Sequence, residues 1–329
     1  MKEISMKLKC HAPWCKFSIN QNDLSYEEVE HKFWTDIHKF NCENLCCIEF
    51  DNMGGIHISF VEEQSLHDIK IISAILLYFI SLCNGFNCEY DPTAIIDCKI
   101  YQNFFSFAQE DKTLLPLVKN QKFYDISLED IQDNFSHIMS VLLSPNNRRY
   151  FLALLSNYYA LTVYKDFVGN GEYRFRNIVT VLESLITLIN SDKYAAKEAE
   201  HANFLQEMKK QELFSNSQID KHILAKGMRL QDKIIDIFDY AKRFGLNIKL
   251  DSSKESQKIA DTRNFISHLF TTEKEFLNSH EISNYTAAFQ ILFRMIFLNY
   301  YGVNVALIKN SFLRNEPNRE LLQQIFNIE

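Results

Sequence analysis

The sequence predicts an α+β N-terminal module over residues 1–121, followed by an all-α helical bundle over residues 122–329. Apolar and polar residues alternate over short stretches in the first third, as in β-strands, whereas an apolar period of 3.6 residues, typical of helices, begins near residue 127. The composition changes along with the period: all 8 Cys lie at or before Cys98, and all ten Arg lie at or after Arg148. This division favours two domains over one.

A β-hairpin is predicted in the first module. Residues 47–50 and 56–61 are short apolar runs, separated by the turn signal Asn52-Met53-Gly54-Gly55. Two such runs across a Gly-Gly turn are typical of a hairpin.

Two helices and one further strand complete the first module. Residues 26–40 have a helical pattern, and a longer helix begins at Ser65 and ends near residue 83, before the C-cap signal Asn84-Gly85. A strand is predicted over residues 95–107. The apolar stripe of the longer helix consists of Ile69, Ile72, Leu76 and Phe79.

Helical periodicity continues through the second module, with short polar connections between the periodic segments. The predicted helices span residues 128–143, 148–168, 172–190, 195–213, 219–225, 233–244, 253–270, 282–301 and 316–328.

The distribution of charge argues against one class of nucleic-acid protein. Residues 1–121 contain 10 Lys and 17 Asp or Glu and so carry the whole formal charge of −7, while the 25 positive and 25 negative charges of the remainder balance. Proteins that grip nucleic-acid backbone without regard to sequence need a broad basic stripe. Any nucleic-acid chemistry must therefore come from a local site.

The sequence also predicts a cytoplasmic protein with no membrane partner. Its start, Met1-Lys2-Glu3-Ile4-Ser5, does not have the apolar core of a secretory signal. The longest apolar run, residues 69–83, contains polar interruptions and is shorter than the roughly 20 residues that cross a bilayer.

In a reducing cytoplasm the cysteines are expected to be thiols and to pack as small buried side chains. Their spacing does not show the paired C-x-x-C signature of structural zinc. No metal and no cofactor is predicted, and zinc held by cysteines is the minor alternative.

One predicted helix carries residues suited to chemistry: Arg263, Asn264 and His268. A capping box of Ser252 and Glu255 is expected to begin this helix. On a helical wheel Arg263 lies at the margin of the apolar arc and Asn264 and Ser267 lie on the opposite face. A half-buried guanidinium requires an anionic partner or an anionic ligand. The expected buried arc consists of Ile259, Thr262, Phe265, Ile266, Leu269 and Phe270.

The run Arg263-Asn264-Phe265-Ile266-Ser267-His268 resembles the R-x-x-x-x-H motif of the HEPN superfamily, and the helical arrangement is most similar to its ApeA-like branch. Residues 173–185, which include Glu183, resemble the apolar helix with an embedded Glu that this family carries. The resemblance covers roughly residues 131–301.

The resemblance implies a metal-independent endoribonuclease that acts in anti-phage defence or as a toxin. His268 would transfer protons at the ribose 2′-hydroxyl and the departing 5′-oxygen, because a histidine titrates near neutral pH. Arg263 would stabilise the charge of the pentacoordinate phosphate, and Asn264 would hold the imidazole or the phosphate. The products would carry 2′,3′-cyclic phosphate and 5′-hydroxyl ends.

Helix geometry makes a homodimer part of this expectation. Arg263 and His268 are five residues apart, about 140° around a helix, so one straight helix does not converge them on one small site. A two-fold dimer that faces this helix against its mate would bring two arginines and two histidines into one cleft. The family resemblance also implies a dimer.

Other residues are predicted to have supporting roles, and a purely structural interpretation is given for those that also have one. Glu183 is expected either to orient Arg263 or to pair with its helix neighbour Arg176. Ser267 lies on the polar face of the motif helix. Arg148 and Arg149 are candidates for contact with RNA backbone, and solvated helix charges otherwise.

Control is expected to come from the acidic N-terminal module, as a sensor or a mask, and from a regulator of phage origin or an antitoxin. Phe270 lies two residues after the histidine, where the branch silenced by nucleotidylation has a tyrosine, so silencing by that route is not expected.

Two other functions remain open. The chain is alternatively a non-catalytic HEPN dimer that binds RNA or a nucleotide as a scaffold, or an all-α structural protein in which the motif is a coincidence. Cleavage that resists EDTA and depends on Arg263 and His268 separates the enzyme from both.

Overall fold

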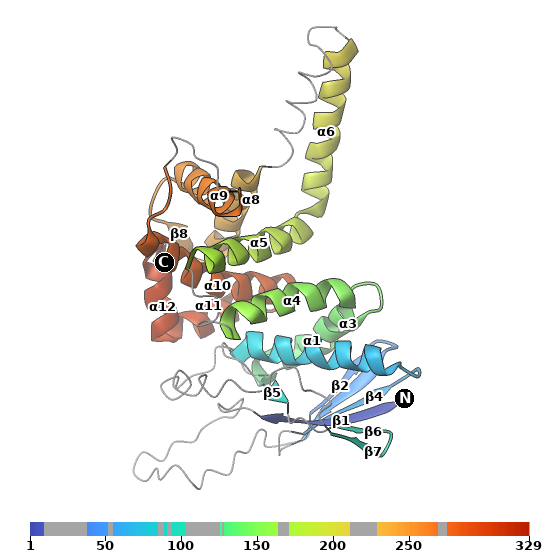
Figure 1. The fold of residues 1–329 in the computed structure, drawn as a ribbon. Coiled ribbons are helices and arrows are strands. Elements are labelled where there is room, and N and C mark those ends of the chain that lie inside the picture. The colour runs from blue at the N-terminus through green and yellow to red at the C-terminus, as the bar shows by residue number, and fades with distance from the viewer. Residues whose placement is uncertain are drawn as a thin grey trace, which may run out of the picture. The chain divides into compact units, whose positions relative to one another are not determined.

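The structure is a computed structural model that describes residues 1–9, 38–51, 55–84, 89–90, 94–102, 126, 128–163, 171–210, 229–268 and 275–328. The chain forms two compact units (Figure 1). The first consists of Met1–Lys165 and Tyr301–Asn315, and the second of Asp166–Tyr300 and Glu316–Glu329.

An antiparallel sheet forms the base of the first unit. Its main path runs β2-β3-β4-β1-β6-β7, and β5 pairs with β1. The strands are β1 (Glu3–Lys9), β2 (His38–Cys42), β3 (Cys46–Phe50), β4 (Gly55–Phe60), β5 (Glu89–Tyr90), β6 (Ala94–Ile96) and β7 (Lys99–Tyr101). The predicted hairpin is β3–β4, in which Ile48 lies opposite Ile58 and both side chains are buried.

The helix predicted over residues 26–40 is wrong at its end, because His38 to Phe40 belong to β2. Residues 26–37 lie outside the described part of the chain. Phe40 pairs with Ile48 of β3, and its ring lies 4.4 Å from that of Phe135. Burial of Phe40 in the sheet therefore outweighs the local helical pattern.

The single strand predicted over residues 95–107 is also wrong, because the chain reverses between β6 and β7. Asp97 and Cys98 form the turn with φ of 45° and 64°. The Asp97 carboxylate accepts the backbone N–H groups of Lys2 and Glu3 at 2.8 and 3.0 Å, and these bonds lower the pKa of Asp97. Residues 103–107 lie outside the described residues.

Helices cover one face of this sheet (Figure 1). Phe135 on α3 packs its ring against Phe40 and Phe50 of the sheet and against Phe79 of α1. The predicted stripe of the longer helix is confirmed, since all four of its side chains are fully buried. The helices of this unit are α1 (Leu66–Asn84), α3 (Leu128–Leu143), α4 (Arg148–Val163) and α11 (Val305–Arg314).

Two features of these helices differ from what the sequence predicts. The helices α3 and α4 were assigned to the second domain, but they lie in the first unit, and α11 was not predicted. Helix α1 is longer than the apolar run of residues 69–83, which the sequence predicts to be too short to cross a membrane. By length and composition alone, Leu66–Cys83 is able to cross a membrane, but 61% of it is buried inside the protein, as in a core helix.

The described cysteines are all thiols, but they do not share one environment. Cys42, Cys46 and Cys83 are buried as expected, Cys47 is half-buried and Cys98 is exposed. Cys10, Cys15 and Cys88 lie outside the described residues. A hydrogen bond with Cys42 and burial both raise the pKa of Cys46.

The second unit is helical, with α10 at its centre. Residues 291–298 of α10 are all buried, and α10 packs against α5. The helices are α5 (Gly171–Ile189), α6 (Ser191–Lys210), α8 (Leu230–Ala241), α9 (Ser252–His268), α10 (Ser279–Tyr300) and α12 (Glu316–Gln323), with the 3-10 turn η2 (Lys242–Phe244). The helix predicted over residues 219–225 lies outside the described residues.

A two-stranded sheet in this unit was missed. Residues 316–328 were predicted as one helix, but α12 ends at Gln323 and the chain continues as β9 (Phe326–Ile328), which pairs with β8 (Leu246–Ile248). Gly245, at φ 72°, turns the chain from η2 into β8. Leu246 and Phe326 are fully buried, so burial of these apolar ends stabilises a pairing of distant segments that no local pattern predicts.

Candidate active site

Helix α9 carries the motif residues, and an aspartate rather than a serine caps its start. The Asp251 carboxylate accepts the N–H of Lys254 at 2.9 Å. The predicted capping box of Ser252 and Glu255 is wrong, because the Glu255 side chain is buried and accepts the hydroxyl of Tyr285 at 2.7 Å. A tertiary hydrogen bond thus replaces the local one.

The buried side of α9 is narrower than the helical wheel predicts. Ile259 and Thr262 are buried, but Phe265 and Ile266 are only half-buried. Leu269 and Phe270 lie outside the described residues. On the polar side, the hydroxyl of Ser267 donates to the carbonyl of Arg263 at 2.9 Å, so Ser267 is engaged by its own helix.

Arg263 lies half-buried between α9 and α5. Its Nη2 is 3.6 Å from Glu183 Oε2, and its Nη1 donates to Asn264 Oδ1 at 3.2 Å. Its Nε is buried and has no hydrogen-bond partner among the described residues. The side chain is 23% exposed, so the guanidinium retains both access to solvent and unused donors.

Glu183, on α5, joins two cations. Lys233 Nζ on α8 donates to Glu183 Oε1 at 3.0 Å, while Arg263 approaches the other carboxylate oxygen. Of the two arrangements left open by the sequence, the structure therefore places Glu183 beside Arg263. Arg176 instead lies over the ring of Tyr173, 4.4 Å from its centre, and donates to Asn177 at 3.5 Å.

His268 is the last residue of α9. Its side chain and residues 269–274 lie outside the described part of the structure. Its relation to Arg263 follows from the helix itself, which separates the two positions by about 140°. Asn264 is exposed and lies one turn before His268 on the same helix.

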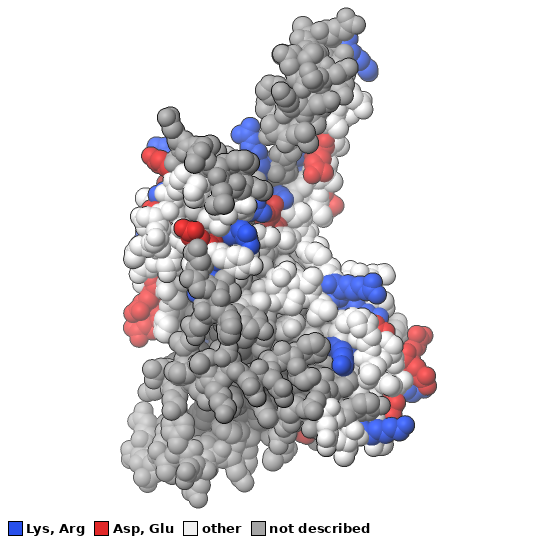
Figure 2. Space-filling view, viewed as in Figure 1, with Lys and Arg blue, Asp and Glu red and all other residues white. Residues whose placement is uncertain are grey.

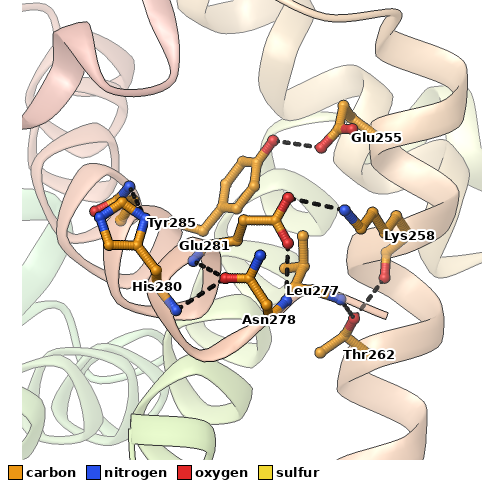
Figure 3. Close-up of polar contacts among 9 residues, drawn as sticks. Glu255, Lys258, Thr262, Leu277, Asn278, His280, Glu281 and Tyr285 are labelled. Carbon is orange, nitrogen blue, oxygen red and sulfur yellow. Dashed lines mark hydrogen bonds and ion pairs between the residues drawn. The ribbon is translucent and has the colours of Figure 1, made fainter. Parts of the chain in front are cut away.

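Contacts with α10 hold α9 in place (Figure 3). Lys258 Nζ lies 2.8 Å from Glu281 Oε1, and Tyr285 donates to Glu255. The hydrogen bond to Glu281 raises the pKa of Lys258. Partial burial opposes ionisation of Glu281, but Lys258 and the Asn278 N–H outweigh it and lower the pKa of Glu281.

The start of α10 is fixed by local and tertiary bonds together. Asn278 Oδ1 accepts the N–H groups of His280 and Glu281, and Glu281 Oε2 accepts the N–H of Asn278 at 2.8 Å, which makes a reciprocal cap. Thr262 Oγ1 accepts the buried N–H of Leu277 at 2.9 Å. Thr262 directly precedes Arg263, so this bond anchors the motif's own turn of α9.

The two other arginine candidates lie in the first unit. Arg148 Nη2 is 2.6 Å from Asp68 Oδ1, and the Arg148 side chain is only 15% exposed, so it acts as an ion-pair partner between α4 and α1. Arg149 is exposed. On the face drawn in Figure 2, basic and acidic side chains lie in small scattered groups over the described residues, consistent with a local site.

Lys233 is a residue of this site that the sequence does not single out. This lysine precedes the buried Ile234 on α8, and its side chain is only 15% exposed. Its flanking position beside an apolar stripe was the only available signal, and many solvated lysines share that signal. Across the described residues, no group of three or more His, Cys, Asp or Glu is arranged to hold a metal ion.

Comparison with known proteins identifies the region around this site. Residues 176–306 match the family model described as Apea-like HEPN. The match begins later than the residue 131 expected from the resemblance, and so leaves out α3 and α4. No curated protein and no solved structure matches the chain. The match includes Glu183, Lys233, Arg263 and His268, and residues 176–306 of this chain therefore form an Apea-like HEPN domain.

Proposed function

We propose that this protein is a metal-independent endoribonuclease of the HEPN type. One observation carries the proposal: in an Apea-like HEPN domain, a half-buried guanidinium held by Glu183 lies on the helix that ends in His268. The superfamily includes nucleases and RNA-binding proteins, which supports RNA as the ligand.

The proposed reaction is an internal transesterification. The ribose 2′-oxygen attacks the adjacent phosphorus while a neutral His268 accepts its proton, and the bond from phosphorus to the 5′-oxygen breaks. The 5′-oxygen takes a proton from a protonated histidine. Arg263 stabilises the extra negative charge on the phosphate oxygens in the transition state. The products are a 2′,3′-cyclic phosphate and a 5′-hydroxyl.

A homodimer supplies the second histidine in this scheme. The positions of Arg263 and His268 are about 140° apart around α9, so two copies related by a two-fold axis would complete the site. Variants that block dimerisation are expected to lose cleavage while Arg263 and His268 are intact. A fully active monomer in solution would contradict this part of the proposal.

The test is cleavage of a labelled RNA in the presence of EDTA. We expect Arg263→Ala and His268→Ala to lower the cleavage rate by roughly 10²–10⁴-fold, because each removes transition-state stabilisation or proton transfer. His67→Ala and Arg243→Ala, at exposed positions on α1 and η2, serve as matched controls and should cleave like the wild type. Equal activity in all variants would refute the assignment.

A role in phage defence or as a toxin is part of the proposal. Induced expression of the wild type should stop growth and produce new RNA ends with 2′,3′-cyclic phosphates, and His268→Ala should do neither. Mapping those ends identifies the target RNA.

A non-catalytic RNA-binding HEPN dimer is the second candidate. It is favoured by the described polar groups, since Arg263 and Asn264 carry hydrogen-bond donors that suit a phosphate and that need no proton transfer to bind it. In that case the wild type binds labelled RNA, Arg263→Ala weakens binding, and the RNA stays intact throughout.

A further inference from the structure

Three helices of the second unit meet at one carboxylate. Glu183 of α5 contacts Lys233 of α8 at 3.0 Å and Arg263 of α9 at 3.6 Å. The side chains are 25%, 15% and 23% exposed, so all three charges are largely removed from water. We call the cluster of Glu183, Lys233 and Arg263 the ion triad. Its net charge is +1.

The two ion pairs of the triad are unequal. Lys233 is within hydrogen-bond distance of Glu183, whereas Arg263 is close enough for electrostatic attraction only. Lys233 Nζ also lies 5.9 Å from the centre of the Tyr194 ring, a second favourable contact for its charge. Glu183 is therefore bound more firmly to Lys233 than to Arg263.

This inequality matters when an anion arrives at Arg263. A guanidinium that turns from Glu183 to a phosphate leaves the carboxylate behind, and an unpaired carboxylate in a largely buried place is costly. Lys233 removes this cost, because it remains bonded to Glu183. The buried Nε of Arg263, which has no partner among the described residues, provides a further unused donor.

We infer that Lys233 is a positioning residue, which keeps Glu183 paired so that Arg263 remains available to a phosphodiester. The inference rests on the proposed function for the identity of the ligand. The state of Arg263 is independent of the proposed function, because it is measurable without RNA. Lys233 acts through Glu183 and does not itself contact the phosphate.

The first experiment measures the reactivity of Arg263 in the full chain. Phenylglyoxal attacks guanidine groups, and an ion-paired guanidinium reacts more slowly; peptide mass spectrometry reports modification at Arg263 alone. In Lys233→Met, Arg263 is the remaining described ion-pair partner of Glu183, so the pair between them should strengthen. Modification of Arg263 should then slow by about two- to fivefold, which corresponds to the free energy of a partly exposed ion pair. The double variant Lys233→Met/Glu183→Gln should react at least as fast as wild type.

Matched variants separate charge from folding. Lys242→Met removes an exposed lysine that pairs with Asp239 and should leave the reactivity of Arg263 unchanged. Lys233→Arg keeps the charge and should preserve the wild-type rate. Lys233→Gln keeps a donor to Glu183 without the charge and replaces Lys233→Met if that variant does not fold. Unchanged reactivity in folded Lys233→Met or Lys233→Gln would overturn the inference.

The second experiment measures RNA cleavage by the same set. We expect Lys233→Met to raise KM more than it lowers kcat, and Glu183→Gln in the same chain to restore KM. If the double variant stays as weak as Lys233→Met, Lys233 contacts RNA directly and the inference is wrong. If reactivity changes as expected but the wild type cleaves no RNA, the inference stands and the ribonuclease proposal fails.

Discussion

Among single residues, Arg263 determines what the site is able to bind. Its guanidinium has one partner on α5 and one on α9, and its Nε has none among the described residues. Arginine remains charged at any physiological pH and presents five donors. An anion with several oxygens, such as a phosphodiester, matches these unused donors.

The buried hydrogen bond from Tyr285 to Glu255 is a residue-scale test of the structure. Tyr285→Phe should lower the free energy of unfolding by about 1–3 kcal/mol, because Glu255 then keeps its burial without this donor. Urea unfolding followed by circular dichroism measures the change. Tyr173→Phe, at an exposed ring on α5, should change it by less than about 0.5 kcal/mol. Equal effects of the two variants would contradict the bond.

At the scale of elements, polar bonds link α9 to the start of α10. The Lys258–Glu281 pair and the Tyr285 bond join these two helices, and the Thr262–Leu277 bond joins α9 to the segment just before α10 (Figure 3). Helix α9 itself is polar over much of its length and is buried only at a few positions. These bonds therefore add polar links to α10 to the packing of α9 against α8 and α5.

The Lys258–Glu281 pair predicts a dependence of stability on pH. Because folding lowers the pKa of Glu281, the pair stabilises the protein above the unfolded pKa and this contribution is lost as pH falls through the folded pKa. Because folding raises the pKa of Lys258, the contribution is also lost as pH rises through that pKa. Glu281→Gln should thus lower the free energy of unfolding by about 1 kcal/mol at pH 7.

Urea unfolding at several pH values measures this difference. The gap between wild type and Glu281→Gln should narrow as the pH falls from the ordinary glutamate value of 4.5 through the lower pKa of the folded protein, below which the wild-type carboxyl is also neutral. Glu320→Gln, an exposed carboxylate on α12, is the control and should show no such gap. A gap that persists unchanged at low pH would show that the charge of Glu281 is not its cause.

For the whole molecule, the chain path links the two units. It leaves the second unit at Tyr300, contributes α11 to the first, and returns at Glu316. Within the first unit the ring of Tyr301 lies 5.7 Å from that of Phe151. The first unit is therefore built from two separate segments of the chain, and a cut between residues 165 and 166 does not separate the units cleanly.

This path predicts the behaviour of a fragment. Residues 166–329 alone should bind the dye ANS and scatter light, because Ile308 and Phe312 of α11 are fully buried in the intact chain and lose their first-unit neighbours. Each such side chain costs about 1.5–3 kcal/mol when exposed. The same fragment with Ile308→Ser and Phe312→Ser should bind less dye. If residues 166–329 without these substitutions bind no ANS, α11 does not need the first unit to bury its apolar side chains.

Local patterns in the sequence predict the elements whose burial is periodic. The stripe of α1, the hairpin β3–β4 and the bounds of α3 follow from patterns within a few residues. The same patterns fail at β2 and β7, which pair with the neighbouring strands β3 and β6 across short turns, and at β9, which pairs with β8 from a distant part of the chain. Pairing energy from a partner far along the chain leaves no local signature.

Period and spacing, which are local properties of the sequence, are enough to predict that the second half is largely helical and that Arg263 and His268 share one helix. Tertiary packing instead brings Glu183 beside Arg263 and Lys233 beside Glu183. These three residues come from three helices, 50 and 30 positions apart in sequence (183 to 233, and 233 to 263). Their meeting depends on how α5, α8 and α9 pack, and packing is set by the buried faces of all three helices together.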